Sequence, residues 1–175
     1  ESELDIGGLD SAHKLTMLSS LCFGAEIDFE NNYITGISEI KYEDIKNAKN
    51  LGYKIKLISE SLLVNNKIFS ITSPKLISMN KPLASVDGVL NAINIETDQL
   101  ESLFLEGEGA GGKATASSVI SDINEIVTNT NVNSLGFKIN NLIKYTKFEL
   151  SNLESPYYLR IMTQDITGVL SKITS

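Results

Sequence analysis

An aspartate and a lysine lie one helical turn apart near the start of the chain, in the stretch DIGGLDSAHK that covers residues 5–14. The simplest interpretation is that Asp10 caps a helix and forms an i,i+4 ion pair with Lys14 on an exposed face. The alternative is that both side chains point into a site where a proton moves, because an ammonium group can protonate a developing oxyanion. The spacing alone leaves both interpretations open.

A second candidate for chemistry is the glycine-rich stretch GEGAGGK, residues 107–113. It matches G-x-G-x-x-G and the front of the phosphate-loop pattern, but the Ser or Thr that should follow the lysine is Ala114, and Thr115 lies about 100° further round a helix. The dinucleotide fingerprint needs a second parallel strand with an acidic residue, whereas TNTNVNS follows the helix. We therefore reject both complete motifs. The glycines either present backbone N–H groups to a cofactor held by another domain or form a tight strand-to-helix turn.

Composition excludes several classes of protein. The chain has 175 residues, 42% of them hydrophobic, which is enough for one domain with a buried core, or one domain with an appendage. A net charge of -7 argues against a nucleic-acid surface. Apolar runs are too short to cross a bilayer, and we find no secretion signal. One cysteine, Cys22, and one histidine, His13, form neither a disulfide framework nor a zinc site, so we expect no metal, a core position for Cys22 and a cytoplasmic location.

The first part of the chain predicts a mixture of helices and strands. Residues 10–23 are expected to form a helix that ends at Gly24, with an apolar stripe made of Leu15, Met17, Leu18, Leu21 and Cys22. A strand over 33–40, a helix over 41–52 and a hairpin of 53–63 with 67–77 around the turn VNNK follow. Two further strands cover 88–97 and 101–106. We predict an α+β fold whose mixed, largely antiparallel sheet has helices packed on one face.

The rest of the chain has a different character. Residues 114–127 predict a helix with an apolar face, and the Asn-rich residues 128–153 predict a connector with at most one short strand. Residues 157–175 predict a strand, a glycine turn and the beginning of a helix. Because these last elements cannot bury a core by themselves, we expect them to begin a further domain.

Four segments in the same order resemble the homoserine dehydrogenase family. DIGGLDSAHKLTMLSSLCFG is similar to its D-x-x-G-x-D-x-x-x-K helix, and ITGISEIKYEDIKNAKNLGYKIKLI to the segment that follows. KPLASVDGVLNAINI and GEGAGGKATASSVISDI resemble its P-L-A-x-V-x-G-x-x-N-A and G-x-G-A-G-x-x-x-T-A-S motifs. In addition, YYLRIMTQDITGVLSKI is similar to the start of an ACT domain, a small amino-acid-sensing module.

The resemblance implies a reaction and a set of roles. The reaction is the interconversion of aspartate 4-semialdehyde and homoserine with NAD(P)H, in threonine, methionine and isoleucine biosynthesis. Lys14 corresponds to the proton donor and acceptor, while Asp10 and Asp5 bind the substrate ammonium and orient Lys14. The cofactor is expected to face Gly107, Gly109, Ala110 and Thr115. The resemblance also implies a homodimer through the sheet and threonine as an effector of the full-length protein.

The same comparison divides the chain and exposes departures from the family. We expect a substrate-binding, catalytic and dimerisation domain over 1–106, a glycine loop and helix over 107–130, a connector over 131–153 and a truncated ACT domain over 154–175. We expect no Rossmann domain before this segment in this chain, and the family's substrate-binding glutamate would fall before Glu1. We therefore expect the isolated chain to be inactive. The alternative function is a non-catalytic dimerisation or amino-acid-sensing regulatory module.

Overall fold

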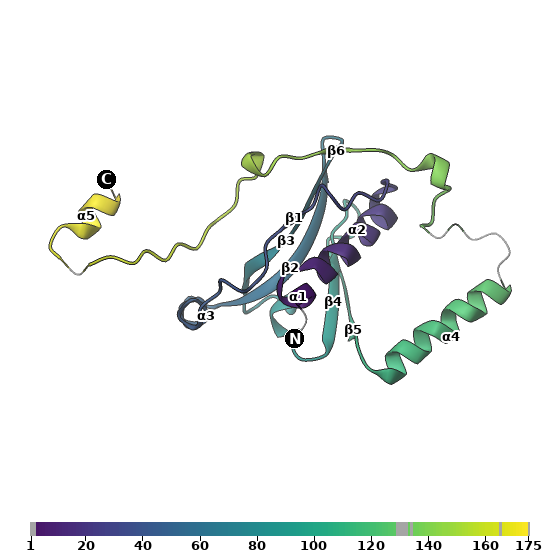
Figure 1. Ribbon diagram of the computed structural model, residues 1–175, viewed down its shortest axis with the longest axis horizontal. Helices are drawn as coiled ribbons and strands as arrows, with labels where there is room; N and C mark the ends of the chain where they lie inside the picture. The colour runs from purple at the N-terminus through teal and green to yellow at the C-terminus, as the bar shows by residue number, and fades with distance from the viewer. Residues whose placement is uncertain (1–2, 129–132, 134, 165, 175) are drawn as a thin grey trace.

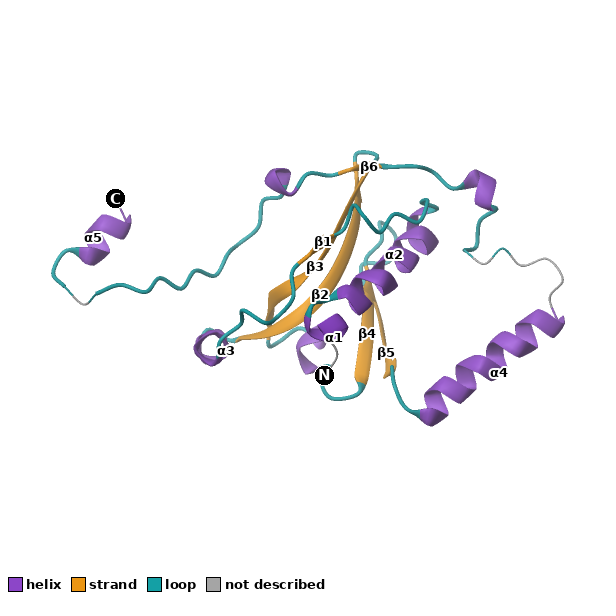
Figure 2. Cartoon of the chain, in the orientation of Figure 1, coloured by secondary structure: helices purple, strands orange, loops and turns teal. Residues whose placement is uncertain are grey.

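The computed structural model describes residues 3–128, 133, 135–164 and 166–174. Figure 2 distinguishes the helices and strands by colour. The helices are α1 (Glu3–Ile6), α2 (Leu9–Phe23), α3 (Tyr42–Asn50), α4 (Gly112–Thr128) and α5 (Val169–Thr174). The strands are β1 (Tyr33–Ile34), β2 (Tyr53–Val64), β3 (Lys67–Ser78), β4 (Leu90–Ile95), β5 (Leu103–Glu108) and β6 (Thr146–Lys147). Single turns of 3₁₀ helix cover Pro82–Ser85, Ile139–Asn141 and Leu150–Asn152.

A long hairpin is the centre of the sheet. Strands β2 and β3 pair in antiparallel register from Tyr53 opposite Ser78 to Val64 opposite Lys67, which confirms the predicted hairpin. The two residues that join the strands, Asn65 and Asn66, have φ of 49° and 64°. Asparagine tolerates this left-handed conformation, and two such residues in sequence match the right-handed twist of the flanking strands.

The remaining strands add both orientations. Strands β1 and β6 pair in parallel with β3, while β4 and β5 form a separate antiparallel pair. The α+β class is therefore confirmed, whereas the description "largely antiparallel" is not. The strand predicted over 33–40 is shortened to Tyr33–Ile34, because the chain turns away from β3 once Thr35 has donated its N–H to Thr72.

Helix α2 lies across one face of the β2–β3 hairpin (Figure 1). Its length and its end at Gly24, whose φ is 62°, confirm the sequence prediction. The predicted apolar stripe is wrong in part, since Met17, Leu21 and Cys22 are exposed. The buried residues of this helix are instead mostly small: Ala12, Leu15, Thr16, Ser19 and Ser20.

Small side chains explain this choice of face, because they let the helix backbone approach the sheet closely. The hydroxyl groups of Thr16 and Ser19 donate to the carbonyl oxygens of Ala12 and Leu15, each at 2.9 Å. These bonds satisfy the hydroxyls inside the helix, so they can be buried without partners from the sheet.

The opposite face of the hairpin has an aromatic core. Phe69 is 1% exposed, and its ring contacts the rings of Tyr33 and Phe148 at centroid distances of 6.0 and 5.9 Å. Alternation along β3 places Phe69 on the face away from Ser70 and Thr72. Tyr33 and Phe148, which are distant in the sequence, thus cover this face together.

The C-terminal third departs most from the predictions. Helix α4 forms where it was predicted, but none of its residues is buried, so the expectation that helices pack on one face fails for α4. Figure 1 shows α4 set apart from the hairpin, beyond the end of β5. The strand predicted at residue 157 is also wrong: within the described residues 157–164 the chain is extended but pairs with no strand. An extended segment without a neighbouring strand forms no ladder.

Candidate functional site

Gly8 marks the beginning of α2. Gly8 is buried with φ of 82°, and a Cβ atom there would lie 3.1 Å from Cγ2 of Thr72 on β3. Helix α2 starts at Leu9 with Gly8 in the capping position and no side-chain cap. The interpretation of Asp10 as the helix cap is therefore wrong, because the helix already begins one residue earlier. Gly8 has the left-handed backbone conformation that glycine adopts readily, and the helix begins directly after it without a side-chain cap.

Asp10 and Lys14 form the ion pair that their spacing predicts. The Nζ atom of Lys14 lies 2.7 Å from Oδ2 of Asp10, and the two side chains are 66% and 46% exposed, respectively. Both groups therefore lie on the outer surface of α2, and the described residues do not enclose them. In this setting the pair itself is worth only about 0.5 kcal/mol, the usual value for exposed ion pairs on a helix.

Asp5 precedes this pair on a separate helical turn. It lies in α1 and is exposed, and its backbone carbonyl accepts a hydrogen bond of 3.2 Å from the N–H of Gly8. The short helix, the glycine pair and the start of α2 thus form one connected unit. That unit presents the carboxylates of Asp5 and Asp10 from neighbouring turns.

The glycine stretch forms a strand-to-helix turn between β5 and α4. Gly107 pairs with Asn91 in the β4–β5 ladder, and Gly109 donates its N–H to the carbonyl of Val89 at 3.1 Å. The Asn91 side chain occupies the space that a Cβ atom on Gly109 would need. Thr115 is bound within the helix, since its hydroxyl donates to the carbonyl of Gly111 at 3.0 Å.

The turn leaves its backbone accessible. A Cβ atom at Gly107, Gly111 or Gly112 would meet nothing within 4 Å, and Ala110 is exposed. A phosphate or carboxamide group could therefore approach this backbone closely, which fits a role in cofactor contact. No hydrogen bond or ion pair between described residues joins the turn to Asp10 or Lys14.

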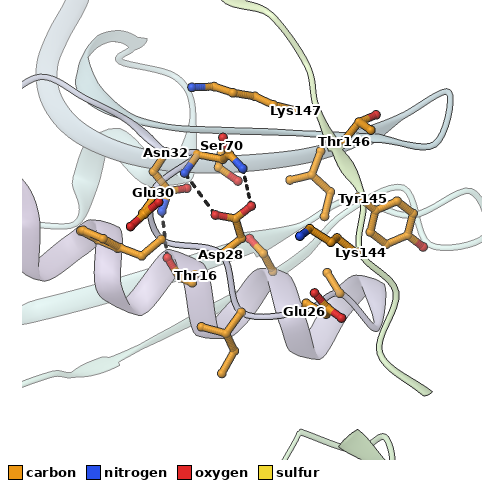
Figure 3. Close-up of a pocket in the computed structure, with 16 residues that line it drawn as sticks. Thr16, Glu26, Asp28, Glu30, Asn32, Ser70, Lys144, Tyr145, Thr146 and Lys147 are labelled. Atoms are coloured by element: carbon orange, nitrogen blue, oxygen red, sulfur yellow. Dashed lines mark hydrogen bonds between the residues drawn. The ribbon is translucent and has the colours of Figure 1, made fainter. Parts of the chain in front are cut away.

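A hollow that was not predicted lies further along α2 (Figure 3). It has a volume of about 470 Å³ and lies between residues 25–32, the end of β3 nearest the turn and residues 144–147. The hydroxyl residues Thr16, Ser19 and Ser70 contribute to its lining, and its charged residues are Glu26, Asp28, Glu30, Lys144 and Lys147. Neither Asp10 nor Lys14 lines it. The sequence gives only a weak signal for it, the acidic alternation in AEIDFE, which is common in loops.

Hydrogen bonds hold one wall of this hollow. The carboxylate of Asp28 accepts from the backbone N–H of Asn31 at 3.3 Å and from its side-chain amide. The amide of Asn32 donates to the Thr16 hydroxyl at 2.8 Å, which ties the loop to α2. Figure 3 draws these bonds as dashed lines, of which the one between Asn32 and Thr16 reaches α2.

A buried carboxylate at the start of α3 was also missed. Asp44 accepts hydrogen bonds from Nε of Arg160 to Oδ1 at 2.6 Å and from Nη2 to Oδ2 at 3.2 Å. The hydroxyl of Tyr158 and the N–H of Lys41 add bonds of 3.2 and 3.0 Å. The Arg160 guanidinium, followed by the Lys41 N–H, lowers the pKa of Asp44 to about 2. Its side-chain partners Tyr158 and Arg160 lie more than a hundred residues along the chain, so no local pattern could have identified this cluster.

Two kinds of feature are absent from the described residues. No group of three or more His, Cys, Asp and Glu side chains there could hold a metal ion. None of the helices in that part of the chain is both long enough and apolar enough to cross a membrane.

The fold and the Asp10–Lys14 pair define an α+β domain that presents an ammonium and a carboxylate from one helix, with a glycine turn opening another. A family model described as homoserine dehydrogenase matches residues 1–124. The homoserine dehydrogenase of Neisseria gonorrhoeae is 36% identical over 98% of this chain. The chain therefore belongs to the homoserine dehydrogenase family, as the motifs predicted.

Solved structures agree. A crystal structure of a homoserine dehydrogenase from Thiobacillus denitrificans matches 85% of this chain with a TM-score of 0.79 and 34% identity, and 36% of that chain is covered. A hyperthermophilic archaeal homoserine dehydrogenase mutant in complex with NADPH matches 74% of this chain with a TM-score of 0.59 and 31% identity, over 35% of that chain. The chain spans about two fifths of its curated relatives, 41% of the Neisseria protein.

Proposed function

We propose that this chain is the substrate-binding part of an enzyme that interconverts aspartate 4-semialdehyde and homoserine with NAD(P)H. The family match supports the reaction. The observation that carries the proposal is the position of Lys14, whose ammonium is held 2.7 Å from the Asp10 carboxylate on a helix whose capping residue, Gly8, lies against the sheet.

Lys14 has the chemistry that this reaction needs. Reduction of an aldehyde places negative charge on its oxygen, and an ammonium group beside that oxygen stabilises the charge and donates a proton. The nicotinamide cofactor supplies the hydride when it is bound. Asp10 holds the Lys14 side chain in position, and with Asp5 it attracts the ammonium group of the amino-acid substrate. In the reverse direction Lys14 accepts the hydroxyl proton of homoserine.

Cofactor contact is proposed for the turn between β5 and α4. Gly107, Gly109, Ala110 and Thr115 are the residues that the family motif assigns to this role, and the open space beside Gly107 supports it. Because Lys14 is 66% exposed in this chain, we infer that other parts of the full-length enzyme cover it. Exclusion of water there would strengthen its interaction with the oxyanion.

As a second proposal, two copies of this chain associate through the sheet. This association would also serve the alternative function, a non-catalytic dimerisation module. Strands β4 and β5 expose large apolar side chains, a feature typical of surfaces that become buried on association: Leu90, Ile93, Leu103 and Leu105. We expect a homodimer, which light scattering coupled to size exclusion tests.

The ACT-like start at 154–175 and threonine as its effector are tested by calorimetry with threonine on the full-length protein. The boundaries at residues 106, 130 and 153 are likewise proposals.

The catalytic role is tested by Lys14→Ala in the full-length enzyme. We expect turnover to fall about 10²- to 10⁴-fold, the usual contribution of a general acid, with a much smaller change in KM. Lys46→Ala is the matched control, because Lys46 is an exposed helical lysine on α3 and its loss removes the same charge. Wild-type turnover in Lys14→Ala would remove Lys14 from the mechanism. The isolated 175-residue chain is expected to show no turnover.

A further inference from the structure

We infer that Asp44 and Arg160 are positioning residues, through which the extended segment 157–164 holds the start of α2 in place. This inference rests on the proposed function in one respect: the proposed function identifies the Asp10–Lys14 pair as the group that is positioned. The links between the segment and the helix are contacts between described residues, and they run from α3 through residues 36–41 to the glycine pair.

The first link is the anchor on α3. The Asp44 side chain is 10% exposed and that of Arg160 is 26% exposed, so the ion pair is largely shielded from solvent. The guanidinium uses two nitrogens on two carboxylate oxygens, a paired geometry that lysine cannot reproduce. The Tyr158 hydroxyl bonds the same carboxylate and accepts a hydrogen bond of 3.2 Å from the amide of Asn47. Two residues of the extended segment are therefore fixed to one helix.

The second link joins the anchor to the chain that precedes α3. The N–H of Lys41 donates to Oδ2 of Asp44, and the N–H groups of Asp44 and Ile45 donate to the Lys41 carbonyl at 3.0 and 3.3 Å. Lys41 is thus held through both its backbone groups. One turn earlier, the N–H of Ile40 donates to the carbonyl of Ile37 at 3.0 Å. The position of the Asp44 carboxylate therefore constrains residues 37–41.

The third link reaches the proposed site. The N–H of Ile37 donates to the carbonyl of Ile6 at 3.0 Å, and Gly36 lies against Gly7. Ile6 ends α1, and Gly8, the capping residue of α2, follows after a single residue. A displacement of residues 36–41 would therefore shift the turn that orients Asp10 and Lys14. Asp44 acts on the pair only through this backbone, so it positions the site and does not take part in the chemistry.

Loss of Arg160 should weaken the connection between α3 and the start of α2 at the hydrogen bond from Ile37 to Ile6. Without the guanidinium, Asp44 keeps its Lys41 and Tyr158 donors but loses the charged partner that makes its burial favourable. The carboxylate then gains from turning toward water, which would release Lys41 and the residues before it. The Ile37 N–H bond to Ile6 is the place where this release would reach α1 and α2.

The experiment is amide hydrogen exchange, read by NMR on the 175-residue chain. In Arg160→Met we expect the Ile37 amide to exchange about three- to tenfold faster than in the wild type, together with shifts of the Gly7 and Gly8 amide signals. Lys147→Met is the matched control: it removes a cation from the same C-terminal region, where Lys147 lies over the Tyr33 ring at 3.8 Å, far from α3 in sequence and contacts. The control should leave Ile37 exchange unchanged.

Two further variants keep the inference falsifiable. Arg160→Lys retains the charge without the paired geometry, and we expect Ile37 exchange between the wild-type and Arg160→Met rates. Asp44→Asn removes the ion pair from the other side and should match Arg160→Met at Ile37. Faster exchange confined to 157–164, with Ile37, Gly7 and Gly8 unchanged, would overturn the inference, since the segment would then be only tethered. These measurements need no substrate, so their failure is distinct from a failure of the Lys14→Ala turnover test.

Discussion

Gly36 lies so close to Gly7 that a Cβ atom on Gly36 would be 2.8 Å from the Gly7 Cα atom. The contact joins the residues after β1 to the turn between α1 and α2, beside the hydrogen bond from Ile37 to Ile6. Backbone meets backbone here, so no side chain can rotate away to make room. The start of the proposed catalytic helix therefore depends on the absence of a side chain at a residue distant in sequence.

Gly36→Ala should consequently lower the free energy of unfolding by about 1–3 kcal/mol, the usual cost of overpacking. Urea denaturation followed by circular dichroism measures it. Gly112→Ala provides the control, because Gly112 begins α4 and a Cβ atom there meets nothing within 4 Å. Equal stability of the two variants would show that the Gly36–Gly7 contact can relax without cost.

Two neighbouring serines of α2 should respond differently to removal of their hydroxyls. Ser20 is fully buried, and its hydroxyl has no hydrogen-bond partner among the described residues, whereas the Ser19 hydroxyl donates to Leu15. An unpaired buried hydroxyl is destabilising, so Ser20→Ala should raise the free energy of unfolding by about 1 kcal/mol. Ser19→Ala should raise it less or lower it. The order of the two denaturation midpoints tests this, and the reverse order would contradict it.

Two leucines of the same helix should also differ. Leu15 is 6% exposed and Leu21 is 45% exposed. Leu15→Ala leaves a cavity and should cost about 2–5 kcal/mol, while Leu21→Ala should cost less than about 1 kcal/mol in this chain. Thermal and urea unfolding of both variants measure the difference. A larger loss from Leu21→Ala would mean that the helix turns a different face to the sheet.

Stability should fall steeply in acid because of two carboxylates. Arg160 lowers the pKa of Asp44 to about 2, and hydrogen bonds from Lys54 and then Lys56 lower that of Asp87 to about 2, from 3.8 in each case. A pKa lowered in the folded state contributes stability above the unfolded value, and this stability is lost as pH falls from near 3.8 through about 2. Urea denaturation between pH 7 and pH 2 measures the loss. Asp44→Asn and Asp87→Asn should each flatten the curve in that window, and curves as steep as the wild type would refute the assignment.

Local patterns predicted the hairpin, α2 and α3 because alternation and glycine ends are encoded by neighbouring residues. The buried face of α2 was predicted in part wrongly, since hydrophobicity selected Met17, Leu21 and Cys22, whereas close packing selected Ser19 and Ser20. The spacing of Asp10 and Lys14 predicted their ion pair, but it gives no information about which groups surround the pair. The Asp44 cluster depends on a partner distant in the chain, and a single sequence records no such pairing.

The bond between Asp44 and Arg160 spans 116 positions of the chain and therefore has a place in the order of folding. Closing so long a loop costs entropy, although each doubling of its length adds only about 0.6 kcal/mol. The hairpin and α3 must form first, because they place the Asp44 carboxylate where Arg160 can bind it. The bond should therefore form late in folding, and in the native protein segment 157–164 should be among the first parts to open.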